Sequence, residues 1–331
     1  MDMVSKNVGS NHSTVIQNYK RTGKTHRLPI VLSGVGKTYG AKSKARWALR
    51  EINLTIEPGV FGLLGRNGAG KTTLLQILST LLLPTEGNIH IGPYDALHQR
   101  WKVRSLMGFL PQDQGFYPRL TVKETLRYMA ALQGLERPEQ HITQVLADVN
   151  LADQARSLMG TLSGGMRRRV GLAQALLGDL PIIIVDEPTA GLDPVEQQRF
   201  RMLLGSLAAH GDRTIILSTH IVADIATIAH RLAVLEKGQI VFQGTVGTLT
   251  EQARGRCWAW RTSIDRIDVL RQDTSLLVSS LSPVTDGTAA PNMVNARIIG
   301  DHLSPEAELC EPTLEDGYFS IIGARENDDH A

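Results

Sequence analysis

The most informative stretch of this chain is Gly65-Arg66-Asn67-Gly68-Ala69-Gly70-Lys71-Thr72-Thr73. It matches the phosphate-loop pattern G-x-x-x-x-G-K-[ST] at every fixed position, and the apolar runs Val60–Leu64 and Leu74–Leu78 flank it. A strand, a loop and a helix in this order distinguish a phosphate loop from a glycine-rich turn with a purely structural role. We therefore predict a nucleoside triphosphate site here.

The residue types in this loop suit the chemistry of phosphate. Glycines let the backbone curl around the phosphates, so that its N–H groups and the positive end of the following helix face the negative charge. Lys71 can reach the β- and γ-phosphates, and the Thr72 hydroxyl can ligate Mg²⁺. The predicted nucleotide contacts of the loop are Gly65, Asn67, Gly68, Ala69, Gly70, Lys71, Thr72 and Thr73.

Two further apolar runs have the composition of buried parallel strands. Ile182–Glu187 ends in two carboxylates, and Thr214–His220 ends in a histidine. At a strand end beside a phosphate loop, Asp186 can hold Mg²⁺, and Glu187 can polarise the attacking water as a general base. The alternatives are solvent-facing carboxylates and a structural histidine, and the buried runs that precede these residues argue against them.

Composition limits the class of protein. The 331 residues suit one large or two modest domains with an ample core, and the net charge of +2 gives no argument for a nucleic-acid partner. No apolar run reaches the roughly 18 residues of a membrane span. The only cysteines, Cys257 and Cys310, are far apart in the sequence and form no metal or disulfide pattern, so we expect a reducing, cytosolic setting.

The start of the chain differs in composition from the rest. Residues 1–28 are polar and basic and lack the apolar core of a signal peptide, which predicts a disordered tail. Contact of the basic cluster Lys20–Arg27 with anionic lipid is the alternative.

The remaining patterns predict an α/β fold with additions. Ile30–Tyr39 and Ala48–Ile56 have the pattern of antiparallel strands, and a capping box at Thr121-Val122-Lys123-Glu124 opens a helical stretch that runs to about Met159. We predict a phosphate-loop NTPase core with a mixed, largely parallel sheet, an antiparallel β subdomain and an inserted helical subdomain at about residues 114–160. This ATPase domain would occupy residues 29–247.

The pattern of apolar and polar residues changes after Gly247. Trp258–Trp260 and Met293–Ile299 read as strands with the loop Ser282–Pro291 between them, and Thr313–Ile322 reads as a short amphipathic helix. Residues 248–331 are therefore predicted to form a small α/β appendage with an acidic tail.

Taken in order, these motifs resemble the ATP-binding subunit of an ABC transporter. The set consists of Gly65–Thr73, Gln112, Leu162-Ser163-Gly164-Gly165, Ile182–Glu187, Ala190-Gly191-Leu192-Asp193 and His220. Many NTPase families share the phosphate loop, but a Ser-Gly-Gly signature upstream of the Asp-Glu strand, with a glutamine before both, is specific. The resemblance covers roughly Ile30 to Gly247, about two thirds of the chain.

The resemblance implies roles for matching residues. Tyr39 would stack on adenine, with core packing as the alternative role. Gln112 would join Mg²⁺ and the attacking water to the helical insertion, and His220 would hold the γ-phosphate and the water. The residues implied for the metal are Thr72, Gln112 and Asp186, and the cofactors are ATP and Mg²⁺.

The resemblance also implies a dimer. Ser163, Gly164 and Gly165 would contact the γ-phosphate bound to the opposite subunit, and Asp193 would lie at the interface. The partner would be a second copy of the chain or a homologous ATPase subunit, so that ATP joins two subunits and hydrolysis releases them.

The signature departs from the family pattern at Met166, where glutamine is usual. Together with Arg167-Arg168-Arg169 it resembles the ATPases of ABC-2 type exporters of drugs, antibiotics or polysaccharides, and so does the segment Pro312–Phe319, apart from Gly317. The arginine run has an alternative interpretation as a solvated helix face.

The expected function is therefore an ATPase that powers transport of a solute, most simply export, with separate transmembrane permease subunits. It would be peripheral on the cytoplasmic side of the membrane, without a nucleic-acid partner. It would dock the permease through the segment from Gly115-Phe116-Tyr117-Pro118 to Met159, with core packing as the alternative role of Phe116 and Tyr117. The alternatives are an importer ATPase and a non-transport ABC-type ATPase of the translation-factor or DNA-repair kind. The single phosphate loop and the absence of heptad runs disfavour the latter, and Glu187 with His220 disfavours a regulator without turnover.

Overall fold

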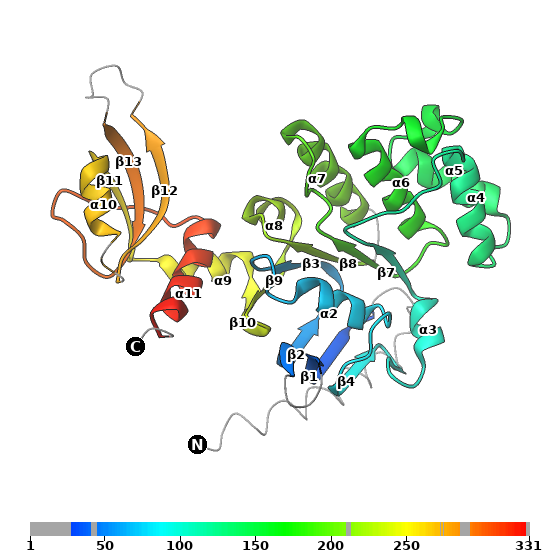
Figure 1. Cartoon of the computed structure of the whole chain (residues 1–331), viewed down its shortest axis with the longest axis horizontal. Helices are drawn as coiled ribbons and strands as arrows, with labels where there is room; N and C mark the ends of the chain where they lie inside the picture. Colours follow the sequence, from blue (N-terminus) through cyan, green and yellow to red (C-terminus); the bar gives the residue numbers. More distant parts are fainter. Residues whose placement is uncertain are drawn as a thin grey trace. The chain divides into compact units, whose positions relative to one another are not determined.

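The computed structural model describes residues 28–40, 45–209, 213–271, 273, 275–284 and 292–328 (Figure 1). The chain divides into two compact units between Ile240 and Val241. The predicted N-terminal tail lies outside the described residues except for Leu28, and so does most of the predicted loop Ser282–Pro291. No helix within the described part of the chain is long and apolar enough to cross a membrane.

A six-stranded sheet forms the centre of the first unit, in the order β10-β9-β3-β8-β7-β6. Strands β9, β3, β8, β7 and β6 pair in parallel, and β7 and β8 are buried along their whole length, as their apolar sequences predict. The predicted phosphate-loop NTPase core is confirmed. The strand bounds are β3 (Gly59–Leu64), β6 (Met107–Leu110), β7 (Ile182–Asp186), β8 (Thr214–Thr219), β9 (Arg231–Glu236) and β10 (Gln239–Thr245).

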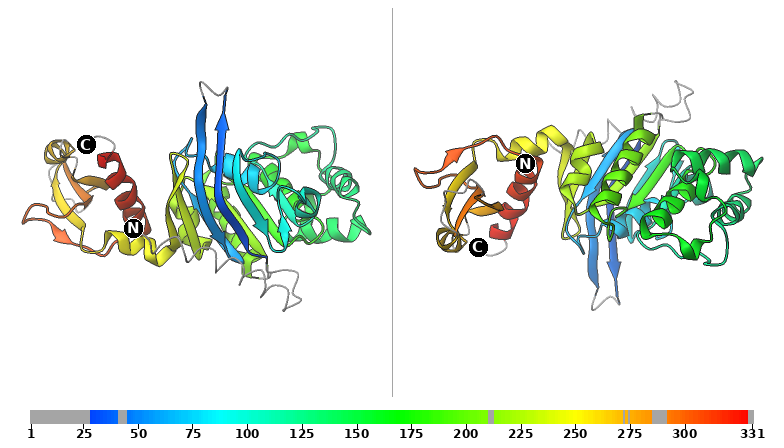
Figure 2. Two further views of the ribbon diagram at one scale, coloured as in Figure 1. Left: turned by 90° about the horizontal axis from the view of Figure 1, so that it is seen from below. Right: turned by 90° about the horizontal axis from the view of Figure 1, so that it is seen from above.

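A second, antiparallel sheet has the order β2-β1-β4-β5. Its long strands β1 (Ile30–Tyr39) and β2 (Arg46–Ile56) are blue in Figure 2, and β4 (Glu86–Ile91) and β5 (Tyr94–Asp95) complete it. Helix α2 (Lys71–Leu78) contacts strands of both sheets, and its buried leucines join them in one hydrophobic core. The phosphate loop is thereby attached to the hydrophobic core of the unit.

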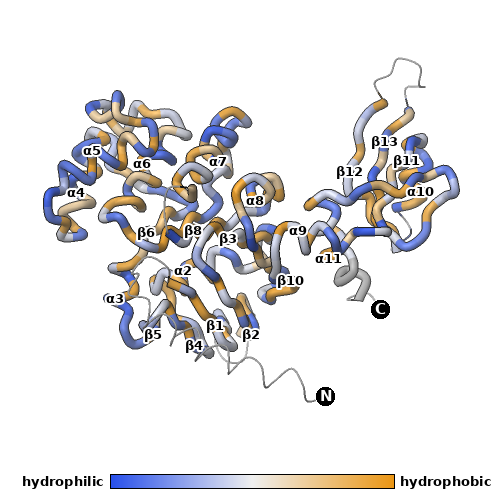
Figure 3. Tube along the Cα trace, turned by 180° about the vertical axis from the view of Figure 1, so that it is seen from behind, coloured by the Kyte–Doolittle hydropathy of each residue, from blue (hydrophilic) through white to orange (hydrophobic). Residues whose placement is uncertain are grey.

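The predicted helical insertion is confirmed as α4 (Val122–Leu132) and α5 (Pro138–Asp148), which pack on each other and on α6 (Gly164–Leu176). The predicted capping box is present: Thr121 Oγ1 accepts a hydrogen bond from Glu124 N at 3.2 Å, and Glu124 Oε2 accepts one from Thr121 N at 2.8 Å. Hydrophilic residues predominate along α4 and α5 in Figure 3, whereas β6 is hydrophobic. Among the described residues of this unit, the other helices are α3 (Arg100–Arg104), α7 (Pro194–Ala209) and α8 (Val222–Ile228), with 3₁₀ turns at Ala152–Gln154 and Met159–Thr161.

The second unit is built on a four-stranded antiparallel sheet in the order β12-β13-β11-β14. Strand β13 lies between β11 and β12, which α10 connects, so the three strands form a split βαβ arrangement. Trp260, Ile267, Ala296 and Ile298 form its hydrophobic core. The elements are α9 (Val246–Thr250), a 3₁₀ turn at Glu251–Ala253, β11 (Cys257–Ser263), α10 (Ile264–Leu270), β12 (Leu277–Pro283), β13 (Met293–Ile299), β14 (Glu308–Leu309) and α11 (Leu314–Asp328).

The view that the two cysteines are isolated is wrong. Cys257 Sγ lies 3.3 Å from Cys310 Sγ, because the short strand β14 pairs with the start of β11. Sequence separation concealed the contact, since antiparallel pairing joins residues that are 53 positions apart.

A buried ion pair joins this sheet to α11. Asp316 is 1% exposed, and its carboxylate accepts from Arg297 Nη2 at 2.6 Å, from Ser279 Oγ at 2.7 Å and from Thr313 N at 2.8 Å. Burial acts to raise the pKa of Asp316, but the hydrogen bonds from Arg297, Ser279 and Thr313 outweigh it and lower the pKa to about 2. The folded unit therefore favours the ionised carboxylate.

We expect Asp316→Asn to destabilise the C-terminal unit by about 2–4 kcal/mol, because it leaves Arg297 without its counter-charge. Since folding lowers the pKa, the stabilisation by Asp316 is complete above about pH 4 and disappears as the pH falls toward 2. Urea unfolding followed by hydrogen exchange in residues 257–328 measures both effects. The control is Asp268→Asn, whose carboxylate pairs with Arg271 on the exposed surface and should contribute little. Equal stability of the two variants would contradict the assignment.

Candidate functional site

The phosphate loop leaves the end of β3 and enters α2 at Lys71. Gly70 occupies the N-cap position with φ 108°, where it has no side chain to cap the helix, and the first turn holds no acidic residue. A Cβ at Gly70 would lie 2.7 Å from the Ala48 carbonyl oxygen, so only glycine fits. The first N–H groups of α2 are therefore available to an anion.

Lys71 is buried and held along the loop. Its Nζ donates to Gly65 O at 2.7 Å and to Arg66 O at 3.1 Å, and it lies 3.0 Å from Glu187 Oε1. The ammonium group thus stands between the loop backbone and the carboxylate that follows β7.

Glu187 connects Lys71 to His220. Its Oε2 lies 2.6 Å from His220 Nδ1, and its N–H donates to Ser218 O at 3.1 Å. The backbone of Glu187 is left-handed, with φ 47°, which costs a side-chain-bearing residue about 1 kcal/mol or more. The surrounding bonds offset this cost and fix the carboxylate, which is 5% exposed, beside an accessible imidazole.

Asp186 has one satisfied and one unsatisfied oxygen. Its Oδ1 accepts a short hydrogen bond from Ser218 Oγ, its register partner on β8. Its Oδ2 is buried and has no hydrogen-bond partner in the described part of the chain. An unpaired carboxylate oxygen is costly unless something binds it, and it suits a hard cation or a water bound to one.

Lys71, Glu187 and His220 line one hollow of about 520 Å³, whereas the predicted metal ligand Asp186 is not among its lining residues. It brings together residues of the phosphate loop, Gln112 from the segment after β6, Glu187 and His220. The lining residues are Ala48, Asn67, Gly68, Gly70, Lys71, Thr72, Thr73, Gln112, Glu187, Ala190 and His220. Ala48 was missed, and Ala190, although it belongs to the motif Ala190-Gly191-Leu192-Asp193, was not predicted to line the site.

Other predicted residues do not line this hollow. Tyr39 is exposed at the end of β1, with Lys37 Nζ 5.4 Å from its ring centre. Ser163 caps α6, accepting from Met166 N at 3.1 Å, and Asp193 accepts from Glu196 N at 2.9 Å at the start of α7.

Three predicted glycines and one predicted alanine also do not line this hollow, and they lie either in the phosphate loop or at the start of α6. Gly65 and Ala69 belong to the phosphate loop, and a Cβ on Gly65 would lie 2.3 Å from Leu235 O. Gly164 is exposed and Gly165 is buried against Glu196 at the start of α6.

Arg168 is a buried residue whose part in this site the sequence did not reveal. Its guanidinium donates to Pro188 O at 2.9 Å and to Pro111 O at 3.4 Å, and it makes shorter bonds to Gln112 O and Glu187 O. Burial lowers its pKa, while nearby carboxylates act in the opposite direction. A solvated face is therefore the wrong interpretation for Arg168, which links α6 to the segments that carry Gln112 and Glu187.

We expect Arg168→Gln to lower the ATP hydrolysis rate by about 10- to 100-fold, because small displacements of positioned groups are costly. Nucleotide affinity should change little, since Arg168 does not line the hollow. Steady-state phosphate release and fluorescent-nucleotide titration separate the two effects. Arg167→Gln is the matched control, because the hydrogen bond of the Arg167 side chain within the described part of the chain goes to Leu162 O in its own segment. A loss of affinity equal to the loss of rate would contradict a positioning role.

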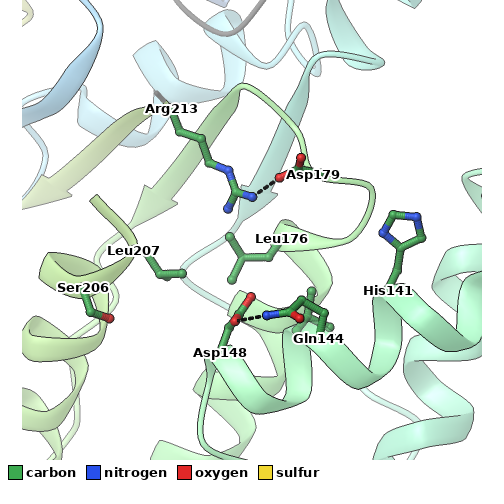
Figure 4. Close-up of a pocket in the computed structure, with 9 residues that line it drawn as sticks. His141, Gln144, Asp148, Leu176, Asp179, Ser206, Leu207 and Arg213 are labelled. Carbon is green, nitrogen blue, oxygen red and sulfur yellow. Dashed lines mark hydrogen bonds and ion pairs between the residues drawn. The ribbon is translucent and has the colours of Figure 1, made fainter. Parts of the chain in front are cut away.

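A second hollow shows that size alone does not identify the site. It measures about 590 Å³ and lies between α5, α6, α7 and the start of β8. Figure 4 shows an ion pair between Arg213 and Asp179 and a hydrogen bond from Gln144 to Asp148 there. None of the motif residues lines it, so the chemistry favours the smaller hollow.

Comparison with known proteins identifies similar sequences. Residues 49–190 match the family model described as ABC transporter. The chain is 35% identical over 229 residues to the ABC transporter ATP-binding protein NatA of Bacillus subtilis, covering 68% of this chain and 93% of NatA. It is 30% identical over 316 residues to the daunorubicin resistance ATP-binding protein DrrA3 of Streptomyces coeruleorubidus, covering 89% and 96%.

Solved structures give the same result for the first unit. The dimeric ABC transporter cassette MJ0796 superposes with a TM-score of 0.60 at 28% identity, covering 65% of this chain and 98% of the cassette. A post-hydrolysis dimer of that cassette with ADP and Pi superposes equally well, with a TM-score of 0.60 at 27% identity and the same coverage. With its phosphate loop, its parallel core and these relatives, the chain belongs to the ATP-binding proteins of ABC transporters and carries their ATPase domain.

Proposed function

We propose that this protein hydrolyses Mg²⁺-bound ATP as one half of a dimer and powers export of a solute through a separate membrane-spanning protein. The observation that carries the proposal is the single hollow in which Lys71, Gln112, Glu187 and His220 meet. A triphosphate on the loop would place its terminal phosphate among these side chains.

Each group in the hollow has a role in this proposal. Lys71 and the N–H groups of α2 bind the β- and γ-phosphates. Glu187 accepts a proton from the attacking water, and His220 orients the same water and the γ-phosphate.

Mg²⁺ would be held by Thr72, Gln112 and Asp186. The buried oxygen of Asp186 without a partner fits a magnesium-bound water, and the ion would neutralise charge on the β- and γ-phosphates.

The rest of the proposed site comes from a second chain. Ser163 and Gly164 are exposed at the N-terminus of α6, outside the hollow, where they can reach a phosphate on a partner subunit with Gly165 behind them. The related cassette is dimeric. Tyr39 would stack on adenine, and Asp193 would lie at the interface.

We expect the ATPase rate per chain to rise with protein concentration, because each site needs residues of two chains. At concentrations below the dissociation constant of the dimer, the rate per chain should fall in proportion to the dimer fraction. Phosphate release measured over a dilution series with saturating ATP gives this dependence.

Mixing variants provides the control. Ser163→Glu chains and Lys71→Ala chains should each be inactive, but their heterodimer contains one intact site. Activity should therefore reappear on mixing, and a mixture that heterodimerises without activity would contradict the shared site.

Export is proposed from the relatives and from the surface. Relatives include a bacitracin transport ATP-binding protein of Bacillus licheniformis and a Nod factor export ATP-binding protein of Burkholderia thailandensis. In this chain Tyr117 is 66% exposed, close in sequence to Gln112, at the start of the helical insertion. An exposed aromatic five residues after a γ-phosphate sensor suits a permease contact on the cytoplasmic side of the membrane.

A photo-crosslinking amino acid at Tyr117 tests this contact. We expect it to capture an integral membrane protein in intact cells, with the yield depending on ATP. The same group at Val269, which is also 66% exposed but lies on α10, is the matched control. Equal capture at both positions, or capture of ribosomal or DNA-bound proteins at Tyr117, would favour the non-transport alternative.

A further inference from the structure

The two cysteines of the chain meet in the C-terminal unit. Trp258 pairs with Leu309 in the β11–β14 ladder, and Cys310 N continues it by donating to Cys257 O at 2.9 Å. The thiols stand opposite each other, with the sulfur atoms 3.3 Å apart.

This geometry suits a disulfide. Directly opposed residues of an antiparallel pair have Cα atoms about 4.5–5.5 Å apart. Disulfides span Cα separations of about 4.4–6.8 Å. Small rotations of the two side chains are therefore enough to form the bond, and the strands need not separate.

The two thiols have different surroundings. Cys257 is completely buried, and Arg297 Nη2 lies 3.3 Å from its sulfur, whereas Cys310 is partly exposed. Burial, the neighbouring Cys310 and the charge of Asp316 raise the pKa of Cys257 to about 12, and Arg297 acts in the opposite direction. An oxidant from solution thus reaches Cys310 first, and Cys257 stays protonated until it reacts.

We propose that Cys257 and Cys310 form an oxidation site that takes a hydroperoxide, with Cys310 as the reacting thiol and Cys257 as the resolving one. The Cys310 thiolate attacks one peroxide oxygen, the O–O bond breaks, and Cys310 becomes a sulfenic acid as hydroxide or alkoxide leaves. Cys257 then attacks the Cys310 sulfur, the S–S bond forms, the S–O bond breaks, and hydroxide leaves with the Cys257 proton as water. The two thiols lose two electrons and the peroxide gains them.

The bond would fix the entry to the last helix. Cys310 is followed by Glu311, whose carbonyl accepts from Arg297 Nη2 at 2.8 Å, and by Thr313, which bonds to Asp316 at the start of α11. Oxidation would close a loop from β11 to this point, which restricts the unfolded chain. We expect the unfolding temperature of the C-terminal unit to rise on the order of 10 °C.

Peptide mass spectrometry of the full chain tests the proposal. After a stoichiometric dose of H₂O₂ and blocking of remaining thiols, trypsin should release residues 257–261 joined to residues 298–325, with a mass two hydrogens below the sum of the peptides. Dithiothreitol should separate them. Overoxidation of Cys310 without this link, or disulfides between two chains instead, would overturn the proposal.

Single variants test the order of events. Cys257→Ala should leave Cys310 as a sulfenic acid that dimedone traps, whereas Cys310→Ala should leave Cys257 unmodified at the same dose. Equal modification of the remaining thiol in both variants would overturn the assigned roles. If either variant fails to fold, the peptide mass spectrometry of the wild-type chain still tests the proposal.

Discussion

Glu187→Gln should bind ATP normally and hydrolyse it about 10²- to 10⁴-fold more slowly, the range lost when a general base is removed. Glutamine keeps the shape of the side chain and can still bond to His220, but it cannot accept a proton from water at neutral pH. The left-handed backbone at this position is no less suited to glutamine than to glutamate. The substitution therefore removes chemistry while retaining the architecture.

The same variant should accumulate as a dimer, because ATP that is bound between two chains is no longer cleaved. Phosphate release gives the rate, and sedimentation velocity with and without ATP gives the association state. Glu139→Gln is the matched control, since Glu139 is an exposed carboxylate paired with Lys123 and Arg127 on the helical insertion. Hydrolysis at the wild-type rate would exclude Glu187 as the base, and monomers in the presence of ATP would contradict the proposed dimer.

Lys71→Ala should weaken nucleotide binding by about 10²-fold or more, because charge-assisted bonds to the phosphates are lost. Isothermal titration with Mg²⁺-ATP measures the affinity. Lys71→Ala also leaves Glu187 buried without its cation, which costs stability independently of binding.

A double variant separates the two effects of this change. Lys71→Ala with Glu187→Gln removes the unpaired charge, so it should recover much of the stability and none of the affinity. Recovery of affinity as well would show that the single variant lost binding through misfolding, and the role of Lys71 would then be wrong.

The sequence predicted those parts of the fold that depend on short, local patterns of residues. The runs before Gly65, Glu187 and His220 are apolar because parallel central strands are buried on both faces, so their ends mark the site. Thr121 and Glu124 likewise predict the start of a helix, because a capping box consists of hydrogen bonds between residues close in sequence. By contrast, β12 was missed, since it holds three serines and a proline and its residues are only partly buried.

What the sequence could not supply depends on contacts between distant segments. In the sequence, Arg168 belongs to an arginine run that is typical of a solvated helix face. Only the fold shows that its guanidinium binds the carbonyl oxygens of Gln112 and Glu187. Ala48 enters the site because β2 passes beside the phosphate loop. The meeting of Cys257 and Cys310 requires a two-residue strand that no periodicity could reveal.

The bonds of Arg168 also have an evolutionary consequence. All four of its acceptors are main-chain carbonyl oxygens, which every amino acid possesses. Side chains at positions 111, 112, 187 and 188 can therefore be exchanged in a descendant without removing an acceptor, whereas any change at 168 removes the guanidinium that donates to all four. Selection on this connection therefore falls on the codon of residue 168.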